Sequence, residues 1–346
     1  MTAKKTASAY ARAGVDIDAK MGALRRARRG IEATFTPGVI GRLGSFGGLF
    51  RSPGAGQILV ASTDGVGTKI KVACAAGRHD TVGGDIVNHC VNDILVQGAE
   101  PLFFMDYIGA SKLEPGTLAA ILRGLCRACR ENGCALLGGE TAEMPGVYPP
   151  GEYDLVGTIV GRVARRELIT GAAIRPGDVI LGLPSSGLHT NGYTLARRIV
   201  FETAGLKPRD PFPGLKRSVA DVLLAVHRSY LAPVRALRRR VAVRGLAHIT
   251  GGGFADNIER VLPAGRCAVI DRSAWTPPPL FRFLAEAGRV DREEMYRVFN
   301  MGIGMVVFVR RADVLAALAA LRRAGERAVP IGNVRAAARA SVELAN

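Results

Sequence analysis

The sequence lacks any long apolar run. No stretch of about 18 consecutive apolar residues occurs in the 346-residue chain, so we expect no transmembrane helix. The first residues, from Met1 to Lys5, do not lead into the apolar segment of a secretory signal peptide. Hydrophobic residues still make up 48% of the chain, which is enough for a sizeable core. We therefore expect a globular cytoplasmic protein with no membrane partner.

Aromatic residues and lysine are also scarce. Aromatic residues account for 6% of the chain, and only eight of the 47 basic residues are lysine. The formal net charge of +17 could favour nucleic acid or anionic substrates. However, the densest arginine groups, at 25–29 and 238–240, are not interleaved with the aromatic side chains that stack on bases. We interpret most of the charge as solvated surface arginine and keep a basic nucleic-acid-binding protein as the alternative.

Cysteine is rare and does not have the spacing of a metal site. Cys126 and Cys129 form a single C-x-x-C pair among six cysteines, and no second pair follows at zinc-binding distance. The pair ends an apolar stripe at helical spacing that begins at Leu118. These cysteines are therefore predicted to be buried, reduced thiols.

Alternating strands and helices fill two halves of the chain, separated by a polar, turn-rich stretch at 165–177. The predicted strands are 57–62, 102–108, 135–137, 153–163, 179–183, 267–271, 303–309 and 329–334. The predicted helices are 20–33, 81–97, 115–132, one that ends near 204, 217–240, 254–261, 278–287 and 311–325. The predicted class is α/β (α+β), with two mixed α/β domains at 1–167 and 168–346.

Four segments rich in glycine and small polar residues follow strands or precede a helix. They are residues 62–69, 138–143, 184–193 and 248–253. Loops at strand ends are where α/β proteins place ligands, so we expect a binding site there. A fifth glycine-rich segment, 44–48, is either a surface connection or a lid over that site.

The first segment combines groups that suit polyphosphate and a metal ion. Asp64 can hold a hard cation, the backbone at Gly65 and Gly67 can approach phosphate oxygens, and Lys69 can neutralise charge. The segment matches neither the P-loop nor the dinucleotide-binding pattern, so an ordinary turn stays an alternative.

Two further carboxylates need partners. Asp93 lies near the end of the predicted helix 81–97, where the helix dipole disfavours a carboxylate and a cation would stabilise it. The alternative is a solvated or locally hydrogen-bonded aspartate. Asp106 interrupts an apolar strand and also needs a partner.

Five histidines occur, and only two lie in the polar segments. These are His189 and His248. The other three, His79, His89 and His227, are predicted to lie on or beside helices in structural roles. Three glycines, 251–253, follow His248 closely and precede a predicted helix, which is a reasonable anion site.

The order of these motifs resembles the phosphoribosylformylglycinamidine cyclo-ligase family, also called aminoimidazole ribonucleotide synthetases. The resemblance extends from about Tyr10 to about Gly332. It rests on segments 63–69, 92–104, 138–146, 185–193, 248–254 and 294–305. The element formed by Asp93, Gly98, Ala99 and Pro101 is shared with a wider ATP-using superfamily, which includes formylglycinamide ribonucleotide amidotransferase, selenophosphate synthetase, thiamine monophosphate kinase and a hydrogenase maturation factor.

Other members of that superfamily are the nearest alternatives. A selenophosphate synthetase would carry a cysteine or selenocysteine near its N-terminus, whereas the first cysteine here is Cys74. A thiamine monophosphate kinase would lack the string at 138–145, and an amidotransferase would be longer or differently ordered.

The resemblance implies an ATP-dependent ring closure in purine biosynthesis. Formylglycinamidine ribonucleotide would be phosphorylated on its formamide oxygen, and its amidine nitrogen would then close the imidazole ring. The products would be 5-aminoimidazole ribonucleotide, ADP and phosphate. The resemblance also implies a homodimer, in which sheets of the N-terminal domains form a β-barrel, and an α/β/α-like C-terminal domain.

The resemblance assigns roles to residues of the polar segments. Magnesium would be held by Asp64 and Asp93, and the catalytic residues would be Lys69, Asp93 and His248. ATP would be bound by Thr63, Asp64, Gly65, Gly67, Thr68, Lys69, Asp106, Gly138, Gly139, Glu140 and Thr141. The substrate would be bound by Ser186, Gly187, His189, Asn191, Gly251, Gly252 and Gly253. Whether His248 acts as an acid–base or only as a hydrogen-bond donor stays open.

Overall fold

The computed structural model describes residues 8–13, 37–40, 48–52, 56–112 and 114–345. The predicted helix 20–33 and most of the glycine-rich segment 44–48 lie outside the described residues. No helix in the described ranges is long and apolar enough to cross a membrane.

Two six-stranded sheets form the framework of the molecule. The first sheet has the order β1 (Val39–Ile40), β2 (Gly48–Arg51), β3 (Gln57–Gly65), β6 (Tyr153–Ala164), β4 (Glu100–Ala110) and β5 (Ala135–Glu143). The second has the order β12 (Ser341–Ala345), β9 (Arg266–Asp271), β11 (Val329–Ala336), β7 (Val179–Pro184), β10 (Ile303–Val309) and β8 (Gly245–His248). Each sheet has one parallel pair, β4 with β5 and β9 with β12, and the other pairs are antiparallel. The predicted class of two mixed α/β domains is confirmed.

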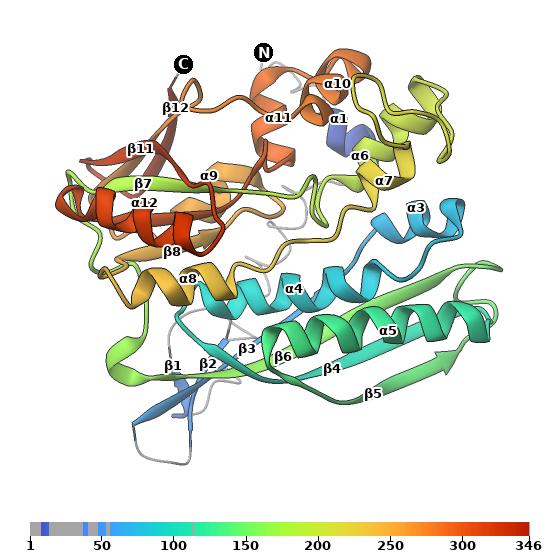
Figure 1. Ribbon diagram of the computed structural model, residues 1–346, viewed down its shortest axis with the longest axis horizontal. Helices are drawn as coiled ribbons and strands as arrows, with labels where there is room; N and C mark the ends of the chain where they lie inside the picture. Colours follow the sequence, from blue (N-terminus) through green and yellow to red (C-terminus); the bar gives the residue numbers. More distant parts are fainter. Residues whose placement is uncertain (1–7, 14–36, 41–47, 53–55, 113, 346) are drawn as a thin grey trace, which may run out of the picture.

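Helices α4 (Val82–Leu95) and α5 (Pro115–Asn132) cover one face of the first sheet (Figure 1). All 14 residues of α4 are buried, because the helix lies between its own sheet and the second half of the chain. Its close contact with α5 depends on glycine: a Cβ at Gly83 would lie 2.4 Å from the carbonyl oxygen of Ile121. Helix α4 is therefore the element that both halves of the molecule share.

Shorter helices complete the structure. Beside the first sheet lies α3 (Lys69–Ala76), and α1 (Ala9–Arg12) packs near the second half of the chain. The second half contains α6 (Tyr193–Arg197), a π-helical turn η2 (Arg198–Thr203), α7 (Val219–Leu223), α8 (Leu231–Arg238), α9 (Gly253–Glu259), α10 (Pro279–Gly288), α11 (Arg292–Val298) and α12 (Val314–Arg323). Two 3-10 turns are η1 (Arg165–Glu167) and η3 (Arg311–Asp313).

The predicted helix 217–240 is wrong, because residues 224–230 between α7 and α8 are not helical. Their backbone bonds to side chains of α4 instead of to itself. The His227 amide donates to Asp85 Oδ1 at 2.7 Å, and the Tyr230 amide donates to Asn92 Oδ1 at 2.9 Å. Asn88 donates to the His227 carbonyl at 2.7 Å. These tertiary partners outweigh the local helical pattern, and we call residues 224–230 the crossing segment.

Two strands extend further along the chain than the sequence predicted. Strand β3 continues to Gly65 and β5 continues to Glu143, so the polar residues at 63–65 and 138–143 lie in strands and not in exit loops. Backbone pairing explains the extension, since Asp64 pairs with Gly157 and Gly139 pairs with Asp106. Helices α1, α3 and α11 and strands β1, β2, β8 and β12 were not predicted.

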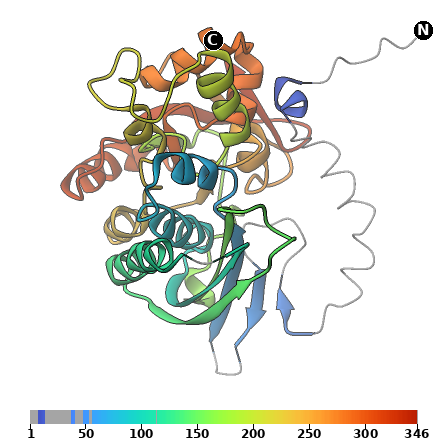
Figure 2. The same ribbon diagram turned by 90° about the vertical axis from the view of Figure 1, so that its right-hand side faces the viewer.

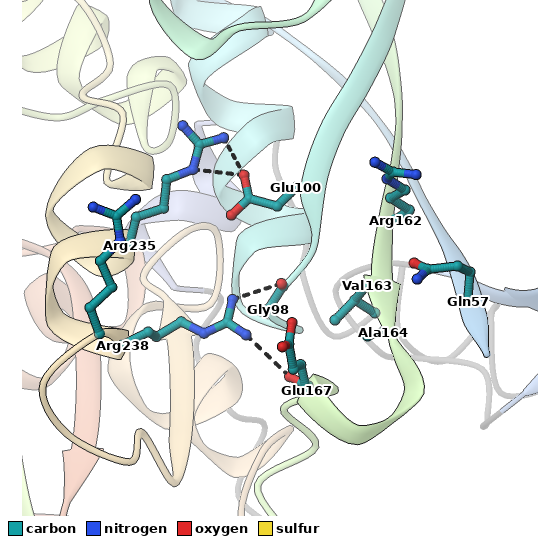
Figure 3. A pocket seen from close by; sticks show the side chains of 10 residues that line it. Gln57, Gly98, Glu100, Arg162, Val163, Ala164, Glu167, Arg235 and Arg238 are labelled. Atoms are coloured by element: carbon teal, nitrogen blue, oxygen red, sulfur yellow. Dashed lines mark hydrogen bonds and ion pairs between the residues drawn. The ribbon is translucent and has the colours of Figure 1, made fainter.

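Two arginines of α8 join the halves of the molecule along a groove of ≈ 700 Å³ (Figure 3). Arg235 pairs with the carboxylate of Glu100 at the start of β4. Arg238 donates to the carbonyl oxygen of Gly98 at 2.8 Å and to that of Glu167 at 3.4 Å. These contacts hold the crossing segment and α8 against the first sheet.

Candidate active site

Four of the five histidines meet where the crossing segment passes α4. They are His89 of α4, His189 after β7, His227 of the crossing segment and His248 at the end of β8. The His227 ring centroid lies 5.1 Å from that of His89, 4.0 Å from that of His189 and 5.0 Å from that of His248. None of the four residues is more than 3% exposed. We call this group the histidine cluster.

Two aspartates border the histidine cluster. Asp64 Oδ2 lies 2.8 Å from His89 Nε2, and Asp93 Oδ1 lies 2.9 Å from His248 Nδ1. The second oxygen of Asp93 lies 3.6 Å from His89 Nε2 and accepts a hydrogen bond from Ser62 Oγ at 3.1 Å. The Asp64 side chain is 45% exposed and that of Asp93 only 7%, so the pair has one open and one enclosed carboxylate.

A continuous series of polar contacts connects the two aspartates through the histidine cluster. Beyond its contact with Asp64, His89 reaches Thr190 Oγ1 through Nδ1 at 2.7 Å. Thr190 lies 3.2 Å from His227 Nδ1, and the Nε2 atoms of His227 and His248 are 3.0 Å apart. Each ring therefore has a fixed orientation.

The charges within the site are arranged around His89. Burial acts to lower the pKa of His89, but the charges of Asp64 and Asp93 outweigh it and raise the pKa to about 9. Burial acts to raise the pKa of Asp64, but the charge on His89 and its hydrogen bond prevail and lower it to about 2. The site at neutral pH thus contains an ionised Asp64 beside a cationic His89.

The other three imidazoles are stabilised in the neutral form. Burial lowers the pKa of His248, and the hydrogen bond to Asp93 only partly opposes this. Burial and the neighbouring rings place the pKa values of His189 and His227 well below the usual value.

The ammonium group of Lys69 is enclosed by protein in this structure. Its side chain is fully buried, and Nζ bonds to Asp85 Oδ1 at 2.8 Å, to the His189 carbonyl at 3.0 Å and to the Ala225 carbonyl at 2.7 Å. An ammonium group has three N–H donors, so all of them are used. Lys69 therefore connects α3 and α4 with two segments of the second half, and it lies behind the histidine cluster.

Several of the other predicted ATP residues lie on strands of the first sheet. Asp64, Gly157, Asp106 and Gly139 are paired in one row across four strands. Burial raises the pKa of Asp106, and no contact between it and the histidine cluster is found among the described residues. Thr63 points to the other face of the sheet, where its hydroxyl lies 2.8 Å from that of Thr158.

Backbone and hydroxyl groups of the first polar segment lie closer to the site. The Gly65 amide donates to Asp64 Oδ1 at 2.7 Å, and Gly67 has a positive φ of 70°. Thr68 contacts Thr194 of the second half at 3.0 Å. In contrast, Gly138, Gly139, Glu140 and Thr141 lie on β5 at the edge of the sheet, away from the histidine cluster.

The predicted substrate residues of the second half lie in two neighbouring loops. The Ser186 amide donates to His189 Nε2 at 3.2 Å, and Asn300 Nδ2 donates a hydrogen bond to the Gly187 carbonyl oxygen at 2.8 Å. A Cβ on Gly251 would lie 3.2 Å from Asn191 Oδ1, so the loops 185–192 and 249–252 meet. Gly252 and Gly253 have φ values of 94° and 64°, which favour glycine at both positions.

His89 and His227, for which we expected structural roles on or beside helices, lie in the histidine cluster, His89 on α4 and His227 in the crossing segment next to it. The spacing of His89 and Asp93, four residues apart on a predicted helix, places both on one face and could have revealed His89. His227 has no comparable local signal, because the crossing segment takes its shape from α4. Ser62 could have been found from strand periodicity, since it lies two residues from Asp64 and shares its face.

Comparison with known families covers nearly the whole chain. Residues 46–163 match the N-terminal domain of AIR synthase related proteins, and residues 175–345 match the C-terminal domain. Proteins named phosphoribosylformylglycinamidine cyclo-ligase from Burkholderia cenocepacia and Burkholderia multivorans are each 51% identical over 329 residues, which is 94% of this chain and 93% of the relative.

Solved structures with similar folds are more distant in sequence. A HypE–HypF complex gives a TM-score of 0.65 at 18% identity and covers 87% of this chain and 90% of the other. AaThiL complexed with AMPPCP and TMP gives 0.64 at 15% identity, covering 94% and 93%. HypE in complex with ATP gives 0.61 at 22% identity, covering 96% and 92%. These three support the fold, and the relatives at 51% identity support the family. The chain belongs to the AIR synthase family, and within it to the phosphoribosylformylglycinamidine cyclo-ligases.

Proposed function

We propose that this chain uses ATP to convert formylglycinamidine ribonucleotide to 5-aminoimidazole ribonucleotide in purine biosynthesis. The formamide oxygen attacks the γ-phosphorus and ADP leaves. The amidine nitrogen then attacks the activated carbon, phosphate leaves, and the nitrogen loses a proton as the ring closes. The observation that carries the proposal is 51% identity, over 94% of the chain, to proteins named for this cyclisation.

The structure suits a reaction that depends on positioning and charge. An amide carbonyl is a poor electrophile with a poor leaving group, and phosphorylation of its oxygen corrects both properties. The protein then has to align the reactants and stabilise phosphate charge. We propose that the first domain, 1–167, binds ATP and forms the dimer, and that the loops 185–192 and 249–252 of the second domain, 168–346, bind the ribonucleotide.

Asp64 and Asp93 fit a magnesium ion that arrives with the nucleotide. Magnesium in nucleotide sites uses one or two protein carboxylates together with phosphate oxygens and water. The Asp64 carboxylate is 45% exposed and can be approached from solvent, while Asp93 is held behind it by Ser62 and His248. When bound, magnesium would neutralise charge on the transferred phosphoryl group.

We propose a positioning role for His248 rather than acid–base contact with the substrate. Its side chain is fully buried, and its two ring nitrogens face Asp93 and His227. Asp93 accepts a hydrogen bond from Nδ1 of His248, and the imidazole ring therefore fixes the direction of the Asp93 carboxylate. Lys69 is proposed to act in the same indirect way, by anchoring the His189 backbone.

We propose that a second copy of the chain packs on the face of the first sheet opposite α4 and α5. Among the described elements, none covers the face opposite α4 and α5 (Figures 1 and 2). That sheet carries Leu102, Met105 and Leu137, which are 37%, 39% and 63% exposed. Exposed apolar groups on a sheet mark a protein interface, and a sheet-to-sheet homodimer would bury them.

The test is an assay with formylglycinamidine ribonucleotide, ATP and magnesium. We expect equal amounts of ADP and of product, which is followed through its diazotisable amine. Selenide and thiamine monophosphate serve as alternative acceptors in parallel reactions. ADP formation with either of these, and no amine product from the ribonucleotide, would contradict the proposal.

A further inference from the structure

We propose that His89, His248, Asp64 and Asp93 form a binding site for a transition-metal ion, with Zn²⁺ as the expected occupant, that needs no nucleotide. This site adds two imidazole ligands to the two carboxylates proposed for magnesium. It does not depend on the proposed reaction, because its evidence is the arrangement of donor atoms.

Three of the donors already lie together, since ligand atoms of His89, Asp93 and His248 are all within 4.8 Å of one another, and Asp64 adjoins this trio through His89. His89 Nε2 lies 2.8 Å from Asp64 Oδ2 and 3.6 Å from Asp93 Oδ2, and His248 Nδ1 lies 2.9 Å from Asp93 Oδ1. Ligands of a tetrahedral zinc ion with bonds of about 2.0–2.1 Å are about 3.3 Å apart. Small adjustments of the three grouped side chains, together with a rotation of the exposed Asp64 side chain toward them, would admit the ion. The rings of His89 and His248 meet at 73°, so their lone-pair directions can converge.

The outer contacts of these ligands are those expected of a metal site. A metal-bound histidine uses its other ring nitrogen in a hydrogen bond that fixes its orientation. His89 Nδ1 is bonded to Thr190 Oγ1 at 2.7 Å, and His248 Nε2 lies 3.0 Å from His227 Nε2. Both carboxylates are also oriented by other groups, since Asp64 Oδ1 accepts from the Gly65 amide and Asp93 Oδ2 accepts from Ser62 Oγ.

The donor set distinguishes between metals. Imidazole nitrogen suits Zn²⁺, Cu²⁺, Fe²⁺ and Ni²⁺, whereas Mg²⁺ prefers carboxylate and water oxygen. His89 gives up its proton to solvent when the ion binds, and two carboxylates with two neutral imidazoles then balance a dication, so burial of the ion does not leave excess charge. The 45% exposure of Asp64 provides an entrance, since the other three ligands are at most 7% exposed.

The alternative trio of His189, His227 and His248 is a poorer site. The rings of His189 and His227 are stacked, with centroids 4.0 Å apart and planes 20° apart. Lone pairs in nearly parallel planes do not meet at one ion. These rings instead support the outer shell of the proposed site.

Occupation of the site has a functional consequence. A zinc ion on Asp64 and Asp93 removes both carboxylates from the magnesium that accompanies a nucleotide. The proposal therefore includes inhibition by transition metals at concentrations far below that of magnesium.

The primary test is calorimetric titration of the full chain, stripped with a chelator, with ZnCl₂ in a large excess of MgCl₂. We expect one ion per chain and an affinity at least about 100-fold higher for Zn²⁺ than for Mg²⁺, as the donor preference implies. Co²⁺ serves as a spectroscopic probe and should give the visible bands of a tetrahedral nitrogen–oxygen site. Equal affinity for the two ions would overturn the proposal, as would a thiolate charge-transfer band.

Variants locate the ion. His89→Gln and His248→Gln should each weaken Zn²⁺ binding by about 100-fold or more, because loss of an outer-shell partner alone costs about 10- to 100-fold. Thr190→Val should cost about 10-fold. The matched control is His79→Gln, which removes the one histidine outside the cluster, bonded to Tyr153 at 3.0 Å, and should leave affinity unchanged. Unchanged binding in both His89→Gln and His248→Gln would overturn the assignment. If these variants do not fold, the wild-type competition and Co²⁺ spectrum still decide it.

Discussion

At the scale of single residues, Asp93 is a proposed catalytic group whose carboxylate is enclosed on several sides. It is a helix residue whose two oxygens face His248, Ser62 and His89. A carboxylate held in this way needs little reorganisation when a cation binds, which is how preorganised charge contributes to catalysis.

Replacement of this carboxylate by an amide tests its role. We expect Asp93→Asn to lower ATP turnover by roughly 100- to 1,000-fold, the usual effect of removing one preorganised electrostatic group. Steady-state ADP release measures the change. Asp313→Asn, which alters a surface pair with Arg310, is the control and should keep its activity. Near-normal turnover in a folded Asp93→Asn protein would remove Asp93 from the site.

The buried Lys69–Asp85 pair leads to a prediction about the free energy of unfolding. Lys69→Met leaves the fully buried Asp85 without its cation, and loss of one partner of a buried pair costs about 3–5 kcal/mol. Lys71→Met is the matched control, because its pair with Glu152 is 40% and 30% exposed and such pairs contribute about 0–1 kcal/mol. Urea unfolding of both variants measures the difference. Equal losses would show that the Lys69 pair is not a structural connection.

At the scale of secondary-structure elements, α4 determines how the site is assembled. Its residues Asp85, Asn88 and Asn92 bond the backbone of the crossing segment, and its residues His89 and Asp93 enter the site. The helix is held against α5 at Gly83 and Gly124, where backbone atoms leave no room for a side chain.

This glycine contact can be tested in isolation. Gly83→Ala would place a Cβ 2.4 Å from Ile121 O and 2.5 Å from Leu125 N, and overpacking of this kind typically costs about 1–3 kcal/mol. Gly116→Ala, in α5 with nothing near the new Cβ, should instead stabilise the helix by up to about 1 kcal/mol. Thermal unfolding distinguishes the two. A stabilised Gly83→Ala protein would mean that α4 and α5 can separate without cost.

At the scale of the whole molecule, the exposed apolar residues of the first sheet predict the oligomeric state. We expect Met105→Arg combined with Leu137→Arg to convert a dimer to a monomer, because two charges cannot be buried unpaired in an apolar interface. Analytical ultracentrifugation measures the mass. Leu315→Arg, at a residue 81% exposed on α12, is the control and should stay dimeric. A dimer that survives the double substitution would place the interface elsewhere.

Much of the organisation was predictable from the sequence. The two-part α/β class and the family were predicted from strand and helix periods and from the order of the polar segments, and both are confirmed. Asp64, Asp93 and His248 were selected as site residues, and the structure brings them together. The domain boundary, the roles of individual site residues and the cytoplasmic location stay predictions.

Local patterns failed where tertiary contacts replaced local ones. The local sequence pattern predicts a helix for the crossing segment, yet its backbone amides and carbonyls form hydrogen bonds with side chains of α4. The same contacts bring His227 into the site. Lys69 was predicted to bind phosphate, which stays a prediction, and the sequence did not indicate its bonds to Asp85 and to two distant carbonyls.

The sequence by itself determined the family, the fold class and the polar segments, because these depend on residue types and on short spacings along the chain. The tertiary structure alone decided that Asp64 and Asp93 are joined through three histidines and Thr190, and that of the two aspartates only Asp64 is open to solvent. The reason is physical: His89 and Asp93 are bonded to Thr190 and His248, which lie more than 100 positions away, and no local pattern encodes such partners.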